Sequence, residues 1–181
     1  MRLKLGEVTL LLGEGVSVGI LFGGKSIGVN AGGGYAYLFY TRCGYEPQGI
    51  GGDFYSPCGG RVVKPGDALE LEGFRVRVVS GYRRAEQGGG VGYVFYLGGV
   101  KVYYAGPTGL VEEIVGLRGE DIDVALLPLG EGAMTPEEAS EVVRTVRPRV
   151  AVPLRAGPER WLYRFRDLSL VYTQVVVPGR R

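Results

Sequence analysis

The chain has 181 residues, of which 45% are hydrophobic and 22% charged, an ordinary composition for a globular protein with a sizeable core. Its net charge of +2 comes from 21 basic and 19 acidic residues scattered along the chain, so nucleic acid is not suggested as a partner. Apolar runs stay well short of the roughly 20 residues that cross a bilayer, and the N-terminus lacks a leader pattern. We therefore expect a cytoplasmic protein with no membrane partner. The single asparagine, Asn30, beside abundant arginine favours a thermophilic source.

The first half of the chain has the pattern of consecutive β-strands joined by glycine-rich turns. Before an irregular stretch at 50–60, the expected strands are Val8–Leu12, Val16–Phe22, Ser26–Asn30 and Tyr35–Thr41. After that stretch they are Leu69–Leu71, Phe74–Ser80, Tyr93–Leu97 and Val100–Ala105. Gly98-Gly99 is expected to form a tight hairpin between the last two strands.

The second half alternates between strand and helix patterns. In chain order we expect a short helix at Thr108–Leu117, a buried strand at Val124–Leu129, a helix beginning after Thr135 and ending at Arg147-Pro148, a strand at Val150–Leu154, a helix at Pro158–Arg166 and a strand at Leu168–Val177. Thr135, Pro136 and Glu138 match an N-cap, a first helical position and a capping box. The whole chain, 1–181, is predicted to be one domain of two packed sheets with helices on at least one outer face.

One glycine-rich segment resembles a phosphate-binding loop. The letters GILFGGKS, Gly19–Ser26, fit the pattern G-x-x-x-x-G-K-[ST], which binds phosphate only where the loop leads into a helix. Here both flanks have strand character. We therefore interpret the Gly-Gly-Lys segment, Gly23–Lys25, as a hairpin turn.

The chain contains no histidine, so it lacks the commonest metal ligand and the usual general base near neutral pH. Its two cysteines, Cys43 and Cys58, are too few for a four-thiolate zinc site. They are either buried thiols or, in a hyperthermophile, a disulfide.

A family resemblance rests on two stretches, GYVFYLGGVKVYYAGPTGL and DIDVALLPLGEGAMTPEEASEVVRTVRPRVAVPLRA. They resemble the simple metal-dependent hydrolase branch of the metallo-β-lactamase superfamily, related to the ascorbate-phosphate lactonases. In that family one strand ends in A-G-D-T, a buried strand ends in L-P-I-G, a helix begins M-x-P-E-E-A and the next strand ends in P-x-H. The resemblance implies an α+β fold, an αββα sandwich of two packed mixed β-sheets with outer helices.

The family's metal ligands do not carry over to this sequence. Its motif T-H-x-H-x-D-H aligns with Thr41–Pro47, so the three histidine positions hold Arg42, Gly44 and Pro47, and the aspartate position holds Glu46. A further histidine position falls near Ser80 to Arg83, with Tyr82 as the favoured match. The metal-bridging aspartate becomes Pro107, and the last histidine becomes Arg155. We therefore expect no metal and no other cofactor, because one carboxylate beside two guanidinium groups does not form a zinc site.

Two interpretations of the substituted positions stay open. In the first, Arg42 and Arg155 pair with Glu46 and fill the former cleft. In the second, the two arginines form a site for a small anionic ligand, with Thr108 and Tyr82 as further candidates.

The resulting functional hypothesis is a catalytically degenerate member of the fold, a pseudoenzyme that acts in binding or as a structural or regulatory protein. The alternative is a hydrolase of phosphoesters or lactones that uses Glu46 as a base and the arginines as oxyanion stabilisers. Flanking arginines would lower the pKa of Glu46 and weaken it as a base. Aromatic residues near the C-terminus, among them Trp161 and Tyr163, leave homo-oligomerisation open.

Overall fold

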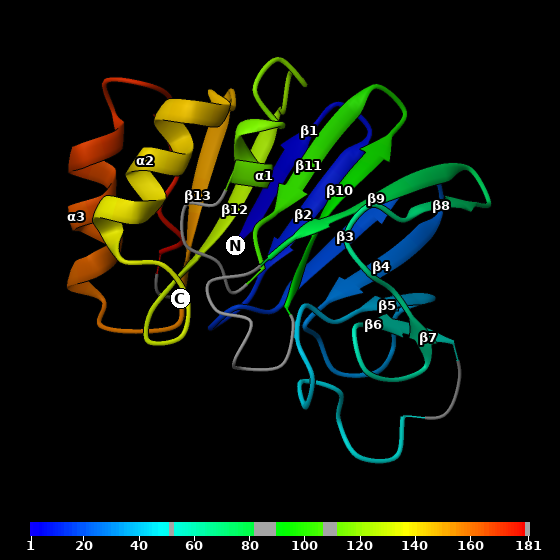
Figure 1. The fold of residues 1–181 in the computed structure, drawn as a ribbon. Coiled ribbons are helices and arrows are strands. Elements are labelled where there is room, and N and C mark those ends of the chain that lie inside the picture. The colour runs from blue at the N-terminus through cyan, green and yellow to red at the C-terminus, as the bar shows by residue number, and fades with distance from the viewer. Residues whose placement is uncertain (51–52, 82–89, 107–111, 180–181) are drawn as a thin grey trace.

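A computed structural model describes residues 1–50, 53–81, 90–106 and 112–179. Two seven-stranded sheets pack face to face, and in each sheet the strands lie side by side in chain order (Figure 1). The first sheet consists of β1 (Arg2–Leu5), β2 (Val8–Leu12), β3 (Val18–Phe22), β4 (Lys25–Val29), β5 (Tyr37–Phe39), β6 (Phe54–Ser56) and β7 (Arg61–Val62). The second consists of β8 (Ala68–Leu71), β9 (Phe74–Ser80), β10 (Val91–Leu97), β11 (Val100–Tyr104), β12 (Val124–Leu129), β13 (Val150–Arg155) and β14 (Gln174–Val175).

Both sheets are mixed, and each changes from antiparallel to parallel pairing along its length. In the first sheet, β1 to β4 pair antiparallel and β4 to β7 pair parallel. In the second sheet, β8 to β11 pair antiparallel and β11 to β14 pair parallel. The parallel connections around β12 contain the helices, because a chain that returns to start a parallel strand must cross the face of the sheet.

Two apolar layers hold the molecule together. The first lies between the sheets, where Ile20 and Phe39 are fully buried and the ring of Phe39 meets that of Phe95 edge to face at 5.2 Å. The second lies between the second sheet and the helices α1 (Glu112–Val115), α2 (Pro136–Val146) and α3 (Arg160–Ser169), and includes Val143 and Phe165. Burial of large apolar side chains on both faces makes the second sheet the central layer.

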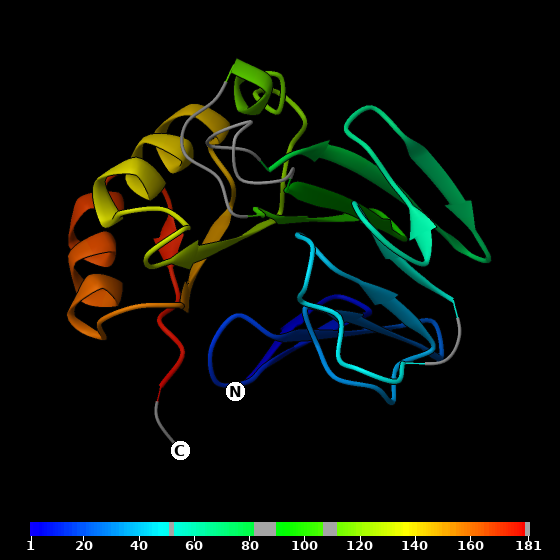
Figure 2. The same ribbon diagram turned by 60° about the horizontal axis from the view of Figure 1, so that its bottom comes forward.

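The predicted sandwich of two mixed sheets with outer helices is confirmed. In the described part of the chain, α2 and α3 lie together on the second sheet, and no helix lies on the outer face of the first sheet (Figure 2). The ring of Tyr35 lies on that face, against Gly19 and Gly28 of neighbouring strands. None of the helices in the described ranges is both long and apolar enough to cross a membrane.

Most expected elements are present, but the structure differs from the prediction at several places. The stretch 50–60, expected to be irregular, contains β6, and β1 precedes the first strand that we expected. The strand predicted at Leu168–Val177 is wrong for most of its length, because α3 continues to Ser169 and only Gln174–Val175 pairs in the sheet. The predicted helix at Thr108–Leu117 appears as the four-residue α1, and its first positions lie outside the described residues.

The segment that resembles a phosphate-binding loop is the β3–β4 hairpin. Phe22 pairs with Lys25 across Gly23 and Gly24, whose φ angles are 55° and 75°. Positive φ at both central positions is typical of the turn that matches the twist of a two-residue hairpin. The hairpin interpretation is confirmed, since no helix follows the loop.

Candidate functional site

Of the residues expected at the site, those in the described ranges lie at or just after the ends of strands of both sheets. Arg42, Gly44, Glu46 and Pro47 belong to the loop after β5, whereas Arg155 is the last residue of β13. Three further candidates, Tyr82, Pro107 and Thr108, lie outside the described residues.

A backbone hydrogen bond joins the two sheets where these strands end, and a close contact holds two strand ends of the second sheet together. The Val91 amide at the start of β10 donates a hydrogen bond to the Thr41 carbonyl at 2.7 Å. A Cβ on Gly106, just after β11, would lie 2.1 Å from the Val91 carbonyl oxygen, which no real side chain tolerates. Glycine is therefore required at the end of β11, the position next to Pro107.

A partly buried hydrogen-bond network around Asn30 connects four segments at the same end of the sheets. The side-chain amide of Asn30 donates to Thr41 Oγ1 at 2.9 Å and to the Tyr104 hydroxyl at 3.1 Å. Its side-chain oxygen accepts from the Thr41 amide at 2.9 Å and from the Thr41 hydroxyl at 3.2 Å. Tyr104 in turn donates to the Val16 carbonyl at 2.6 Å. The network fixes the start of the loop that carries Arg42 and Glu46.

Sequence reasoning missed this network. Asn30 was expected only as the end of a strand, and Thr41 only as the first letter of a degenerate motif. The available signal was that a lone asparagine precedes a run of glycines, because asparagine tolerates the left-handed backbone that Asn30 adopts, with φ of 48°.

The candidate loop is also held by a disulfide between Cys43 and Cys58, whose Cα atoms are 5.4 Å apart. That separation is normal for a disulfide. The question left open by the sequence is thus answered in favour of the disulfide, which ties the loop after β5 to the turn between β6 and β7.

The two arginines of the site do not pair with Glu46. The Arg42 guanidinium lies over the Tyr45 ring, 5.1 Å from its centre, and Nη1 is 3.5 Å from the point where a Cβ of Gly132 would stand. Arg155 Nε donates to the Gly157 carbonyl at 3.4 Å. Within the described ranges, no ion pair joins Glu46 to either arginine, so the predicted space-filling salt bridge does not form.

Glu46 is instead held by neutral donors. Its Oε2 accepts from the Gly44 amide at 2.9 Å. Burial acts to raise the pKa of Glu46, but hydrogen bonds from the Ser56 hydroxyl and from the amides of Glu46 and Gly44 outweigh burial and lower the pKa. The predicted direction of this shift is confirmed, but its cause is hydrogen bonding rather than the neighbouring arginines. A carboxylate held in this way is a weak proton acceptor.

This pKa shift predicts how Glu46 contributes to stability at different pH values. A carboxyl with a lowered folded-state pKa stabilises the fold above its ordinary value of 4.5 and loses that effect as pH falls through the folded-state value. We expect Glu46→Gln to lower the melting temperature at pH 7 and to differ progressively less from the wild type as pH falls below 4.5. Thermal melts of both proteins between pH 3 and 8 test this, and a difference that grows in acid would contradict it.

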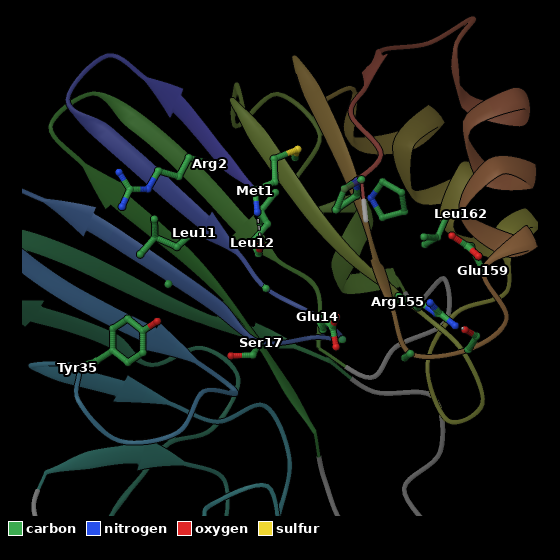
Figure 3. A pocket seen from close by; sticks show the side chains of 18 residues that line it. Met1, Arg2, Leu11, Leu12, Glu14, Ser17, Tyr35, Arg155, Glu159 and Leu162 are labelled. Carbon is green, nitrogen blue, oxygen red and sulfur yellow. Dashed lines mark hydrogen bonds between the residues drawn. The ribbon is translucent and has the colours of Figure 1, made fainter. Parts of the chain in front are cut away.

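A large cavity of about 980 Å³ opens beside Arg155. It lies between β1 to β3 on one side and the end of β13, the start of α3 and the segment at Pro178 on the other. Figure 3 shows Met1 and Leu12 toward its middle, with Arg2, Leu11 and Tyr35 at one end and Arg155 and Glu159 at the other. Arg42 is not among the lining residues.

The donor set at this edge does not fit the zinc centre that the fold family implies. Such centres use imidazole nitrogen, thiolate or several carboxylates, whereas the chain has no histidine and both cysteines form the disulfide. In the described ranges, no three Cys, Asp or Glu side chains come close enough to hold an ion. Glu46, with its oxygens directed to backbone amides and Ser56, is a single carboxylate. The described residues therefore do not form a zinc site of this kind.

Comparison with known proteins agrees with the fold. A family described as beta-lactamase superfamily domain matches residues 46–155, which is more than half of the chain. The chain therefore belongs to the beta-lactamase superfamily.

Among the relatives are proteins named UPF0173 metal-dependent hydrolases. One from Thermoplasma acidophilum is 33% identical over 132 residues, which cover 64% of this chain and 57% of that protein. Another, from Pyrobaculum arsenaticum, is 35% identical over 131 residues, which cover 66% of this chain and 56% of that protein. The chain thus spans little more than half the length of these relatives.

Solved structures show the same fold at lower identity. A protein from Parabacteroides distasonis, whose name calls it a metal-dependent hydrolase, superposes with a TM-score of 0.81 at 18% identity, covering 100% of this chain and 98% of that one. Igni18, a metallo hydrolase of the hyperthermophilic archaeon Ignicoccus hospitalis, gives a TM-score of 0.69 at 21% identity, with 96% of each chain covered.

Proposed function

We propose that this chain is a catalytically degenerate member of the beta-lactamase superfamily that binds a small anion in the former metal cleft. Its Arg42 and Arg155 occupy histidine positions of the metal-binding family, so fixed protein charge replaces part of the charge of the metal. The observation that carries the proposal is that neither guanidinium pairs with Glu46, although Arg42 and Glu46 share the loop after β5 and Arg155 ends β13. Guanidinium groups are well suited to carboxylate and phosphate.

The geometry allows both arginines to serve one site. Arg42 reaches the loop after β12 at Gly132, and Arg155 leads into Gly157, where a Cβ would lie 2.9 Å from Gly130 Cα. The short loop 130–132 therefore connects the surroundings of both guanidinium groups. Among the described residues, no carboxylate forms an ion pair with Arg42 or Arg155, although Glu14 and Glu159 line the same cavity as Arg155.

Thermal melts in inorganic phosphate and in acetate test this proposal. At a tenfold excess over the dissociation constant, a ligand that binds only the folded state raises the melting temperature by roughly 3–6 °C for a chain of this size. We expect most of that rise to be lost in Arg42→Ala and in Arg155→Ala. Arg75→Ala is the matched control, because Arg75 lies over the Tyr96 ring at 4.2 Å, away from this edge.

Two outcomes would contradict the proposal. One is that neither phosphate nor acetate raises the melting temperature. The other is a full equivalent of zinc, manganese or iron in protein purified without chelators and lost on substitution of Glu46, since such a metal would occupy the cleft.

The relatives are named hydrolases, which supports a second candidate function. This is the hydrolysis of phosphoesters or lactones with Glu46 as the base. It predicts activity that survives a chelator and disappears in Glu46→Gln. We favour the binding function because the lowered pKa of Glu46 makes it a weaker base at neutral pH.

A further inference from the structure

The first strand of the first sheet, β1, has a free edge. Among the described strands it pairs only with β2, so the other side of its backbone has no partner strand there (Figure 1). The Met1 amino group donates to the Leu12 carbonyl at 2.7 Å, and the Leu12 amide donates back to the Met1 carbonyl at 2.8 Å. In an antiparallel ladder, such doubly bonded pairs alternate with unbonded ones. The backbone amides and carbonyls of Arg2 and Lys4 therefore point away from β2, toward the free edge.

The side chains of β1 alternate between two surroundings. Leu3 and Leu5 are half-buried and pack against the core between the sheets. Arg2 and Lys4 are exposed and lie on the opposite, outer face of the sheet. Among the described residues, no carboxylate forms an ion pair with either cation. A strand added at this edge would thus alternate between positions beside the cations and positions beside the leucines.

The two cations decide which strand fits the edge. Two copies of β1 that paired antiparallel about Leu3 would place Arg2 of each copy opposite Lys4 of the other, on the same face. Like charges directly opposite are destabilising, and lysine on an edge strand is a common means of preventing edge-to-edge pairing. The same cations attract a strand that carries carboxylates at those positions. The edge therefore rejects a second copy of itself and selects an acidic partner.

The edge strand of the second sheet, β8, has the opposite charge. The Asp67 carbonyl accepts from the Val78 amide of β9 at 2.8 Å, so the alternation along β8 directs the backbone groups of Ala68 and Glu70 to the free edge. Both residues are exposed, and Glu70 carries a negative charge. An acidic strand would be repelled at β8 and attracted at β1.

We propose that β1 binds an extended acidic peptide of a partner protein by adding it to the first sheet as an antiparallel strand. Carboxylates of the peptide lie opposite Arg2 and Lys4, and its apolar side chains lie beside Leu3 and Leu5. The backbone groups of β1 supply hydrogen bonds, and the cations set the preference for an acidic sequence. This inference does not rest on the proposed anion-binding function.

Fluorescence anisotropy with short labelled peptides tests the proposal. The probe is the capped peptide Val-Glu-Val-Glu-Val, whose central valine lies opposite Leu3 when both glutamates lie opposite the cations. We expect saturable binding that weakens as salt is added, because salt screens exposed charges. The peptide Val-Lys-Val-Lys-Val should bind at least about tenfold more weakly.

Backbone methylation of the probe separates strand pairing from simple charge attraction. In the antiparallel arrangement the glutamate amides point toward β1, and the amide of the central valine points away from it. Methylation of both glutamate amides should weaken binding at least about tenfold, because it removes their hydrogen bonds and places methyl groups in the ladder. Methylation of the central valine amide is the matched control and should change the affinity by less than about threefold.

Variants of the protein make the same separation. Lys4→Pro removes a backbone donor at the free edge, and proline is tolerated on edge strands, so this variant should fold but bind the peptide at least about tenfold more weakly. Lys4→Gln keeps the donor and removes the charge, which should weaken binding by about twofold to fivefold. Glu70→Pro is the matched control on β8 and should leave peptide binding unchanged. Thermal melts show whether each variant is folded.

Three results would overturn the inference. One is the absence of saturable binding up to about 1 mM peptide. Another is equal affinity for the two methylated probes, since the peptide would then not pair through the edge that the hydrogen-bond pattern leaves free. The third is loss of peptide binding in Arg155→Ala, which would place the peptide at the anion site instead. Stabilisation by phosphate should be the same in Lys4→Pro as in the wild type, so the edge and the anion site are tested independently.

Discussion

Replacing Asn30 with alanine is expected to lower the free energy of unfolding by about 3–4 kcal/mol. The substitution removes a side chain that makes hydrogen bonds with the Thr41 amide, the Thr41 hydroxyl and the Tyr104 hydroxyl. Thr41 is only 1% exposed, so its amide would be left buried without a partner. The backbone at Asn30, with φ of 48°, adds strain for alanine. Chemical denaturation of wild type and variant measures the difference.

Two further variants divide this effect into its parts. Asn30→Gly removes the same hydrogen bonds without the backbone strain and should be less destabilising than Asn30→Ala by about 1 kcal/mol. Tyr104→Phe removes only the hydroxyl between Asn30 and the Val16 carbonyl and should cost about 1–2 kcal/mol. A loss below 1 kcal/mol in Asn30→Ala would show that the network does not hold this edge together.

Reduction of the disulfide between Cys43 and Cys58 is the second large effect that we expect. The cysteines are separated by 15 positions, and closing a loop of that length stabilises a fold by about 3 kcal/mol through the unfolded state. Reductant should therefore lower the free energy of unfolding by about this amount. It should also weaken anion binding, because Arg42 is next to Cys43 in the tethered loop.

The control for this effect is the double variant Cys43→Ser with Cys58→Ser, whose stability should match that of the reduced wild type and should not respond to reductant. Thiol titration in denaturant provides an independent measurement. Two free thiols in unreduced, denatured wild type would contradict the disulfide.

The sequence predicted helices and strands correctly where the signal comes from residues that are close together in the chain. Thr135 and Glu138 form the expected capping box, in which the Glu138 amide donates to the Thr135 hydroxyl. Val124–Leu129 is a fully buried strand, as its continuous apolar run indicated. The strand predicted at Leu168–Val177 was wrong because its apolar run belongs in part to a helix. Leu162, Phe165 and Ser169 are buried at helical spacing, and this pattern extends α3 into the apolar run.

The candidate site was predictable only in part. The positions of Arg42 and Glu46 after an early strand and of Arg155 at the end of a later one followed from the resemblance to the family. Their contacts did not, because these depend on residues distant in the chain. Asn30 bonds with Thr41 and Tyr104, which are 11 and 74 positions away. No pattern in the nearby sequence indicates that Glu46 accepts hydrogen bonds from neutral groups, or that it does not pair with an arginine.

The order of strands in the two sheets has a consequence for how the chain folds. Each strand lies beside its neighbours in sequence, with β1 to β7 in one sheet and β8 to β14 in the other. Hydrogen-bonded ladders can therefore extend one strand at a time, with only short loops to close at most steps. The long-range step is the docking of the two sheets, which brings Val16 to Tyr104 across 88 positions. We infer that the edge carrying the arginines forms last, when the two halves of the chain meet.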